Sequence, residues 1–120
     1  MVTVYGIKNC DTVKRARKAL DAAGIDYRFH DFKTDGLESA KAQQWIDALG
    51  LDAVLNRRGT TWRRLDETSR EGVTADNAAA LLASQPSLVK RPVIEYPGGV
   101  RIGFARTDET TILAELRGAS

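Results

Sequence analysis

The sequence has little of the residues that build disulfide frameworks and metal sites. Its 120 residues include one cysteine, Cys10, and one histidine, His30. A single thiol cannot form an internal disulfide, and a conventional structural zinc site needs four cysteine or histidine ligands. We therefore expect no metal, no tightly bound cofactor and a reducing compartment, the cytoplasm.

Long apolar runs and a strong charge of one sign are also missing. No stretch approaches the roughly 18 apolar residues of a membrane-spanning helix, and Met1 to Val4 runs into strand-like sequence without the features of a secretory leader. Lys and Arg number 18 against 16 Asp and Glu, a net charge of +2. We expect no membrane or nucleic-acid partner. With 42% hydrophobic and 28% charged residues, the composition predicts one globular domain over residues 1–120.

The first thirty residues predict a βαβ unit. Val2 to Tyr5 are β-branched or aromatic, which favours a short strand. From Asp11 to Ala23 the apolar positions recur three and four residues apart, the pattern of an amphipathic helix. Tyr27 and Phe29 then alternate with polar residues, as in a half-buried strand with His30 on its surface. The two strands should be parallel.

The rest of the chain predicts helices, then a hairpin, then a last helix. Apolar spacing indicates a helix from Glu38 to Leu49, whereas residues 51–72 lack periodicity and predict a polar connection with at most short helical turns. Thr74 can cap a third helix that ends before Pro86. Tyr96-Pro97-Gly98-Gly99 predicts a tight turn between strands that extend from Val93 to Phe104, and Thr107 or Asp108 can start the final helix.

Cys10 lies where the first strand gives way to the first helix. A lone cysteine is often a small buried residue, but Lys8, Asn9 and Thr12 make this segment polar. Unpaired backbone N–H groups at a helix start bind anions. A thiolate there is stabilised by the helix dipole and by Lys8, and such surroundings lower a cysteine pKa from about 8.5 to roughly 3.5–7.5. We therefore expect a reactive thiol, and since no CxxC pair is present, resolution from outside the chain.

Basic and aromatic side chains elsewhere allow plainer interpretations. Four basic residues between Lys14 and Lys18 avoid the apolar stripe of the first helix, which favours a solvated surface over a patch for phosphate or an acidic partner. For the arginines between Arg57 and Arg64, a solvated face and a functional role both stay open. Trp45 and Trp62 are expected to be packing residues. Arg91 precedes Pro92, a bond that can be cis.

Taken together, these segments resemble the ArsC/Spx family. The resemblance rests on Tyr5-Gly6-Ile7-Lys8-Asn9-Cys10-Asp11-Thr12, on Leu55-Asn56-Arg57-Arg58, on Arg91-Pro92-Val93 and on the Pro-Gly-Gly hairpin. It covers essentially the whole chain and is closest to the YffB-type members. It implies an α/β thioredoxin-like (glutaredoxin-like) mixed sheet with a helical insertion at about residues 36–85.

The resemblance also implies roles for particular residues. On the family pattern Cys10 matches the nucleophile, Arg57 and Arg91 the first and second anion-binding arginines, and Pro92 the cis-proline. Lys8, Asn9 and Thr12 belong to the same site. The third arginine of arsenate reductases is matched by Phe104, with Arg106 only nearby. In such a fold the strand that begins after Pro92 lies beside the first strand, which brings Arg91 opposite the Cys10 loop.

These assignments imply a glutathione-dependent monothiol oxidoreductase. Glutathione would be its co-substrate and glutaredoxin a further partner. Two alternatives stay open: a glutaredoxin-coupled arsenate reductase, and a regulator that binds RNA polymerase as Spx does. The missing third arginine counts against arsenate, and the missing CxxC counts against the regulator.

Overall fold

The computed structural model describes residues 1–119, which divide into two compact units. One unit combines residues 1–35 with 91–119, and the other is formed by residues 36–90. The second unit thus interrupts the first in sequence, over nearly the range in which a helical insertion is predicted.

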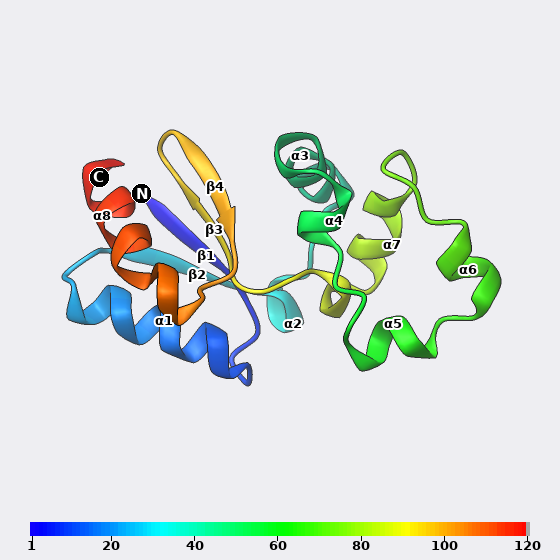
Figure 1. The fold of residues 1–120 in the computed structure, drawn as a ribbon, viewed down its shortest axis with the longest axis horizontal. Helices are drawn as coiled ribbons and strands as arrows, with labels where there is room; N and C mark the ends of the chain where they lie inside the picture. The colour runs from blue at the N-terminus through cyan, green and yellow to red at the C-terminus, as the bar shows by residue number, and fades with distance from the viewer. Residues whose placement is uncertain (120) are drawn as a thin grey trace. The chain divides into compact units, whose positions relative to one another are not determined.

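The first unit is built on a mixed four-stranded sheet in the order β2-β1-β3-β4. β1 pairs parallel to β2 and antiparallel to β3, and β3 pairs antiparallel to β4. The βαβ unit and the hairpin are therefore confirmed (Figure 1). The elements are β1 (Val2–Gly6), α1 (Asp11–Ala22), β2 (Tyr27–Asp31), α2 (Phe32–Asp35), β3 (Val93–Tyr96), β4 (Gly99–Ile102), η2 (Arg106–Asp108) and α8 (Glu109–Ala119).

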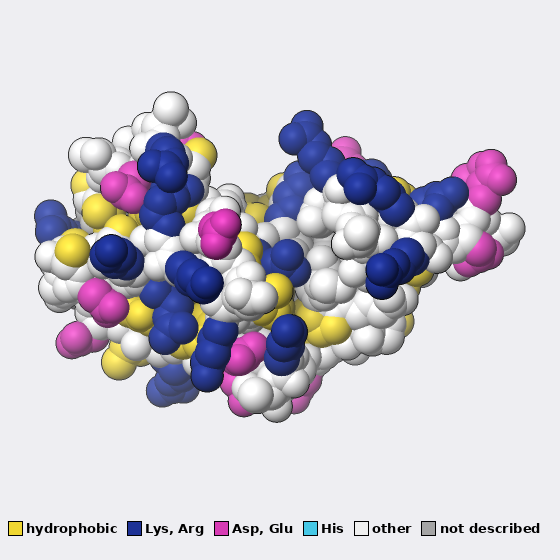
Figure 2. All heavy atoms as spheres, turned by 90° about the horizontal axis from the view of Figure 1, so that it is seen from below, with side chains coloured by type: hydrophobic (Ala, Val, Ile, Leu, Met, Phe, Trp, Pro, Cys, Tyr) yellow, Lys and Arg dark blue, Asp and Glu magenta, His cyan; other side chains and the backbone are white. Residues whose placement is uncertain are grey.

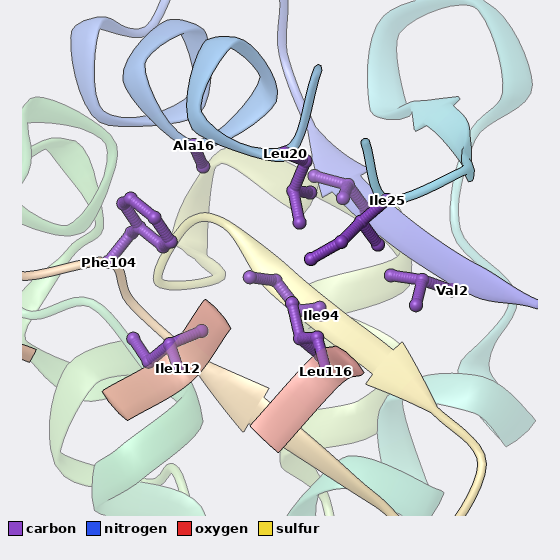
Figure 3. Close-up of a cluster of buried hydrophobic side chains, with 9 residues drawn as sticks. Val2, Ala16, Leu20, Ile25, Ile94, Phe104, Ile112 and Leu116 are labelled. Carbon is purple, nitrogen blue, oxygen red and sulfur yellow. The ribbon is translucent and has the colours of Figure 1, made fainter. Parts of the chain in front are cut away.

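The main core of this unit lies between the sheet and two helices on the same face. Leu20 from α1, Leu116 from α8 and Ile94 from β3 are completely or almost completely buried and meet there. Phe104, which follows β4, fills the space between the two helices (Figure 3). Burial of such side chains contributes about 1.5–3 kcal/mol each. The helices are therefore held to the sheet chiefly by their apolar stripes.

The second unit consists of helices, most of them short. Buried Trp45 of α3 confirms the packing role predicted for it, and α3 packs against α7. An isolated bridge between Leu55 and Val89 joins two extended segments of this unit. The elements are α3 (Ser39–Leu49), α4 (Leu51–Val54), α5 (Thr60–Arg64), α6 (Glu67–Glu71), α7 (Ala78–Ser84) and η1 (Pro86–Leu88).

Two boundaries differ from the sequence expectation. Thr74 does not cap α7, because the helix begins at Ala78 after Asn77. Instead, the Asn77 side chain accepts a hydrogen bond from the backbone N–H of Thr74 at 2.8 Å, which closes a turn just before the helix. The second strand of the hairpin ends at Ile102, because Gly103 adopts φ +90°, a left-handed conformation that breaks the extended chain.

Candidate active site around Cys10

Cys10 occupies the position just before the first turn of α1. Its backbone is extended (φ −111°, ψ 124°), and its carbonyl accepts a hydrogen bond from the backbone N–H of Lys14 at 2.9 Å. The side chain is half-buried, and within residues 1–119 it makes no capping hydrogen bond to the helix. The thiol therefore lies beside the helix N-terminus but does not cap it. Amides of the first turn are available to an anion bound there.

Gly6 explains how the Cys10 loop can leave the sheet so close to α1. A Cβ atom at Gly6 would lie 2.7 Å from Cγ2 of Val13, which is shorter than a normal carbon–carbon contact. The missing side chain at the end of β1 thus lets buried Val13 pack directly over the strand. This close approach fixes the entry of the helix, and with it the backbone that carries Cys10.

Arg91 and Pro92 lie at the same end of the sheet as the Cys10 loop. Tyr5 pairs with Val93 across the antiparallel β1–β3 ladder, so Pro92, which directly precedes Val93, lies at the end of the sheet where β1 ends at Gly6. The Arg91–Pro92 peptide bond is cis. The Pro92 carbonyl accepts a hydrogen bond from the backbone N–H of Gly103 at 2.8 Å. This bond holds the chain after β4 at this end of the sheet. Arg91 is half-buried and its Nε is inaccessible to solvent.

The same end of the sheet holds a buried carboxylate that the sequence did not single out. Asp31 ends β2 and pairs in register with Gly6. The backbone N–H of Lys33 donates a hydrogen bond to Oδ1 of Asp31 at 2.9 Å, and the hydroxyl of Thr34 donates one to the Asp31 carbonyl oxygen at 3.4 Å. These bonds cap the short helix α2, so Asp31 has a structural role.

Two titratable side chains lie on the sheet face away from α1. Tyr5 Oη donates a hydrogen bond to Glu95 Oε1 at 2.5 Å, and burial together with this bond raises the pKa of Tyr5 above its ordinary value. Tyr5 therefore stays protonated at neutral pH. His30 was predicted on the strand surface, but its ring is half-buried, with its centroid 4.8 Å from that of Tyr5. His30 is half-buried because the neighbouring strands β1 and β2 place its ring beside that of Tyr5.

The structure corrects the expectation for the basic residues of α1. Lys14 and Lys18 are exposed as predicted, but Arg15 and Arg17 are half-buried. The Arg17 guanidinium lies 4.0 Å from the centroid of the Phe29 ring and donates to the Tyr27 hydroxyl at 3.2 Å. Long arginine stems can cover apolar surface even where the helical pattern places them outside the core stripe.

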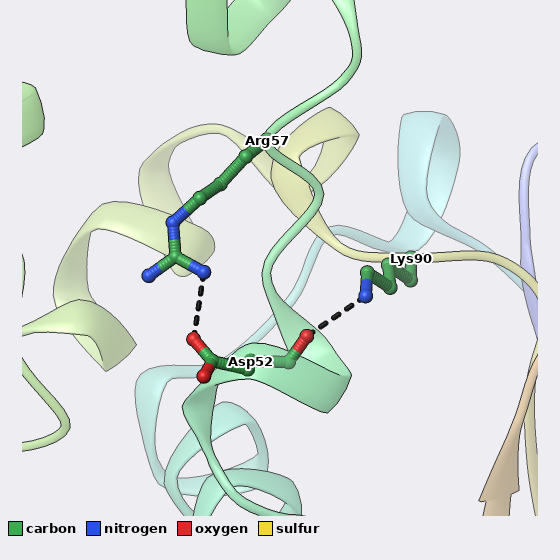
Figure 4. Close-up of polar contacts among 3 residues, drawn as sticks. All are labelled: Asp52, Arg57 and Lys90. Carbon is green, nitrogen blue, oxygen red and sulfur yellow. Dashed lines mark hydrogen bonds and ion pairs between the residues drawn. The ribbon is translucent and has the colours of Figure 1, made fainter.

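Arg57 belongs to the helical unit and has an acidic neighbour there. Its Nη1 donates to Asp52 Oδ1 at 2.7 Å, and its guanidinium lies 5.6 Å from the centroid of the Trp62 ring. Lys90 Nζ donates to the Asp52 carbonyl at 2.8 Å (Figure 4). The Asp52 side chain is 89% exposed, and exposed ion pairs contribute no more than about 1 kcal/mol. A ligand anion could therefore replace Asp52 at small cost.

The remaining predicted site residues are distributed around the first unit. Lys8 and Asn9 are exposed in the Cys10 loop, and Thr12 is half-buried in the first turn of α1. Arg106 is exposed in η2, where it lines a surface hollow together with Arg15 and Lys18 of α1. Among residues 1–119 no three His, Cys, Asp or Glu side chains are grouped so as to hold a metal ion. No helix in that part of the chain is long and apolar enough to cross a membrane.

A mixed sheet with a cysteine at the start of α1 and a cis-proline at the start of β3 is thioredoxin-like in arrangement. The profile of the ArsC family matches residues 5–112, and the chain belongs to this family. A solved YffB protein is 40% identical, with a TM-score of 0.88, over 94% of this chain and 99% of its own.

Two further relatives carry names that indicate different functions. A solved protein from Brucella melitensis, described as related to arsenate reductase, is 45% identical with a TM-score of 0.74 over 92% of each chain. The global transcriptional regulator Spx of Streptococcus pyogenes is 26% identical over 87% of this chain and 78% of its own. The family therefore includes relatives named for a reductase and relatives named for a regulator.

Proposed function

We propose that this protein is a glutathione-dependent monothiol oxidoreductase with Cys10 as its nucleophile. The observation that carries the proposal is the position of Cys10, which is half-buried just before α1, makes no capping hydrogen bond to the helix, and follows β1 at the end of the sheet where the Arg91–Pro92 segment leads into β3. Helix N-termini stabilise thiolates, and the thiolate is the attacking form of cysteine. The chain contains no second cysteine, so a monothiol cycle needs an external thiol.

The cycle has two thiol–disulfide exchanges. The Cys10 thiolate attacks the glutathione sulfur of a glutathionylated protein, forms a Cys10–glutathione disulfide and releases the protein thiolate, which takes up a proton. The thiolate of a second glutathione then attacks the glutathione sulfur of that disulfide. Oxidised glutathione leaves, and the Cys10 thiolate is regenerated. In sum, the glutathionylated protein and one free glutathione become the protein thiol and oxidised glutathione.

The basic residues supply complementary charge for glutathione, which carries two carboxylates. The planar guanidinium groups of Arg57 and Arg91 would pair with these carboxylates, and Lys8 would add positive charge at the loop. Asn9 and Thr12 would support the loop, and Arg106 would contribute a more distant charge. Glutaredoxin remains a second partner in the proposal.

Arsenate reduction is the second candidate, because the Brucella melitensis relative is described as related to arsenate reductase. The observation against it is Phe104. This residue stands where arsenate reductases carry their third arginine and is buried in the core, with 1% of its surface exposed. A tetrahedral oxyanion would therefore have one charged ligand fewer.

The test compares wild type with Cys10→Ser on two substrates. With a glutathionylated peptide, excess glutathione, glutathione reductase and NADPH, we expect wild-type turnover and none with Cys10→Ser, while thermal melting shows the same fold. Mass spectrometry should find one glutathione adduct on wild type after treatment with oxidised glutathione. Faster turnover of arsenate in the presence of glutathione and glutaredoxin would favour the second candidate. Absence of both activities, with co-purification of RNA polymerase, would favour a Spx-like regulator.

A further inference from the structure

A second surface feature lies away from the Cys10 loop, between α1 and the beginning of α8. It is a hollow of about 390 Å³. Its lining residues are Arg15, Lys18, Ala19, Ala22, Arg106 and Glu109. We call it the α1–α8 groove. The methyl side chains of its two alanines leave room between the longer charged side chains, so a partner's side chain can enter there.

The charge of the α1–α8 groove is strongly one-sided. Three of its residues are cations and one is a carboxylate, and that carboxylate, Glu109, already lies 3.6 Å from Arg15. Lys18 and Arg106 are exposed. Figure 2 shows the molecule from below, with many Lys and Arg side chains on this face and Asp and Glu side chains interspersed among them.

Two other hollows of the first unit do not share this charge. A hollow beside β2 is lined by Arg17 together with Asp21 and Asp26. Another, near Met1, combines Asp26 with Arg117. The first has one cationic and two carboxylate side chains, and the second has one of each, so neither offers an excess of positive charge to an acidic ligand. The excess of positive charge in the α1–α8 groove is therefore a local property and does not follow from the net charge of the chain.

Arg15 is held in place within the groove before any ligand arrives. Its Nη2 donates to the carbonyl of Phe104, and its guanidinium lies 5.3 Å from the centroid of the Phe104 ring. A charged group that is already fixed loses little conformational entropy when a partner binds. Lys18 and Arg106, which are exposed, would close around the ligand.

From the charge and the lining we propose that the α1–α8 groove binds an acidic segment of a partner protein. Carboxylates of Asp or Glu would pair with Lys18 and Arg106, and a small apolar side chain between them would lie against Ala19 and Ala22. Nucleic acid fits less well, because Asp11 and Asp21 on the exposed surface of α1 would repel a continuous phosphate backbone. The proposal concerns a partner site and does not depend on thiol chemistry at Cys10, although Arg106 would belong both to this groove and, as a distant charge, to the proposed glutathione site.

The experiment measures binding of a fluorescein-labelled Glu-Ala-Glu-Ala-Glu-Ala peptide by fluorescence anisotropy. The groove variant carries Lys18→Glu and Arg106→Glu. The matched control carries Arg28→Glu and Lys33→Glu, which are exposed on β2 and α2 and give the same net charge. We expect about tenfold weaker binding in the groove variant and less than about twofold in the control, with wild-type binding weakened between about 20 and about 150 mM salt.

A second measurement locates the peptide on the wild-type protein. Amide chemical-shift changes in a ¹H–¹⁵N spectrum should centre on Arg15, Lys18, Ala19 and Arg106. Equal loss of binding in both variants, shift changes spread over the whole surface, or no binding at low salt would overturn the proposal. Tighter binding of a labelled oligothymidine with the same number of charges would overturn it in favour of nucleic acid. Thermal melting of both variants confirms that each is folded.

Discussion

The guanidinium of Arg15 lies over the ring of Phe104, 5.3 Å from the ring centroid, and donates a hydrogen bond to the Phe104 carbonyl. The two residues are 89 positions apart in the sequence. Phe104 is therefore a buried aromatic residue, 1% exposed, with an arginine from α1 packed against its ring. The contact joins α1 to the segment that precedes α8.

Replacing Phe104 by arginine should not restore an anion site but should destabilise the protein. The new charge would be buried beside Arg15 and among apolar side chains, at a cost of about 3 kcal/mol or more. Urea unfolding measures the change. Phe104→Leu, the size-matched apolar control, should cost about 1 kcal/mol. A stable Phe104→Arg protein with increased arsenate turnover would contradict this assignment.

Gly6 should be sensitive to the addition of a single methyl group. In Gly6→Ala the new Cβ meets Cγ2 of Val13 at 2.7 Å, so we expect a loss of about 1–3 kcal/mol in the free energy of unfolding. Val13→Ala removes the clashing atom, and the double variant should lose about 1 kcal/mol less than the sum of the single variants. Gly118→Ala is the control, because a Cβ there meets nothing within 4 Å. Additive losses in the double-variant cycle would show that the contact is not limiting.

Replacing Arg91 by lysine tests its place in the proposed site. The substitution keeps the charge but removes the planar pair of donors that suits a carboxylate. We expect an intact fold by thermal melting and weaker glutathione binding by calorimetry, by roughly 1.5–3 kcal/mol if the contact is desolvated. Unchanged affinity would place Arg91 outside the glutathione site.

Asp52 should compete with glutathione for Arg57. Since the pair is exposed, Asp52→Asn should change the free energy of unfolding by less than about 1 kcal/mol. If Arg57 binds glutathione, removing the competing charge should tighten binding by about two- to fivefold, which corresponds to less than about 1 kcal/mol. Asp76→Asn, exposed in the same unit, is the control for net charge. The same affinity in both variants would remove Arg57 from the site.

The link between the hairpin and α8 should weaken in acid. Glu115 accepts a hydrogen bond from Tyr96 and one from Arg101 at 2.5 Å, and these, the Tyr96 bond most strongly, hold the pKa of Glu115 below its ordinary value of about 4.5. A carboxylate whose pKa is lower in the folded state stabilises the fold above about pH 4.5, and this contribution is lost as the pH falls through the lowered pKa.

Glu115→Gln isolates this effect. Its urea midpoint should lie below that of wild type at about pH 7, and the difference should shrink at about pH 2.5. The contribution of Tyr96 to stability changes at the alkaline end of the pH range. The same hydrogen bond raises its pKa, so its contribution is present at neutral pH and lost only in strong alkali. A difference between wild type and Glu115→Gln that does not vary with pH would contradict the ionic role of Glu115.

Local interactions made several features predictable from the sequence. The apolar spacing of α1 and the Tyr96-Pro97-Gly98-Gly99 turn depend on residues that are close in the chain, and both were predicted correctly. Cys10 was placed before a helix for the same reason. The short helices within residues 51–72 were expected only as isolated turns, because helices of this length are too short to show a period and depend on packing.

Tertiary structure decided what happens to side chains that local pattern leaves ambiguous. Arg15 and His30 belong to correctly predicted elements, yet each is more buried than its pattern indicates. The reason is that their neighbours arrive from a distant part of the sequence or from an adjacent strand: Arg15 lies against Phe104, and His30 lies against Tyr5 of β1. Helical and strand periods determine which way a side chain points, whereas burial depends on what the fold brings to meet it.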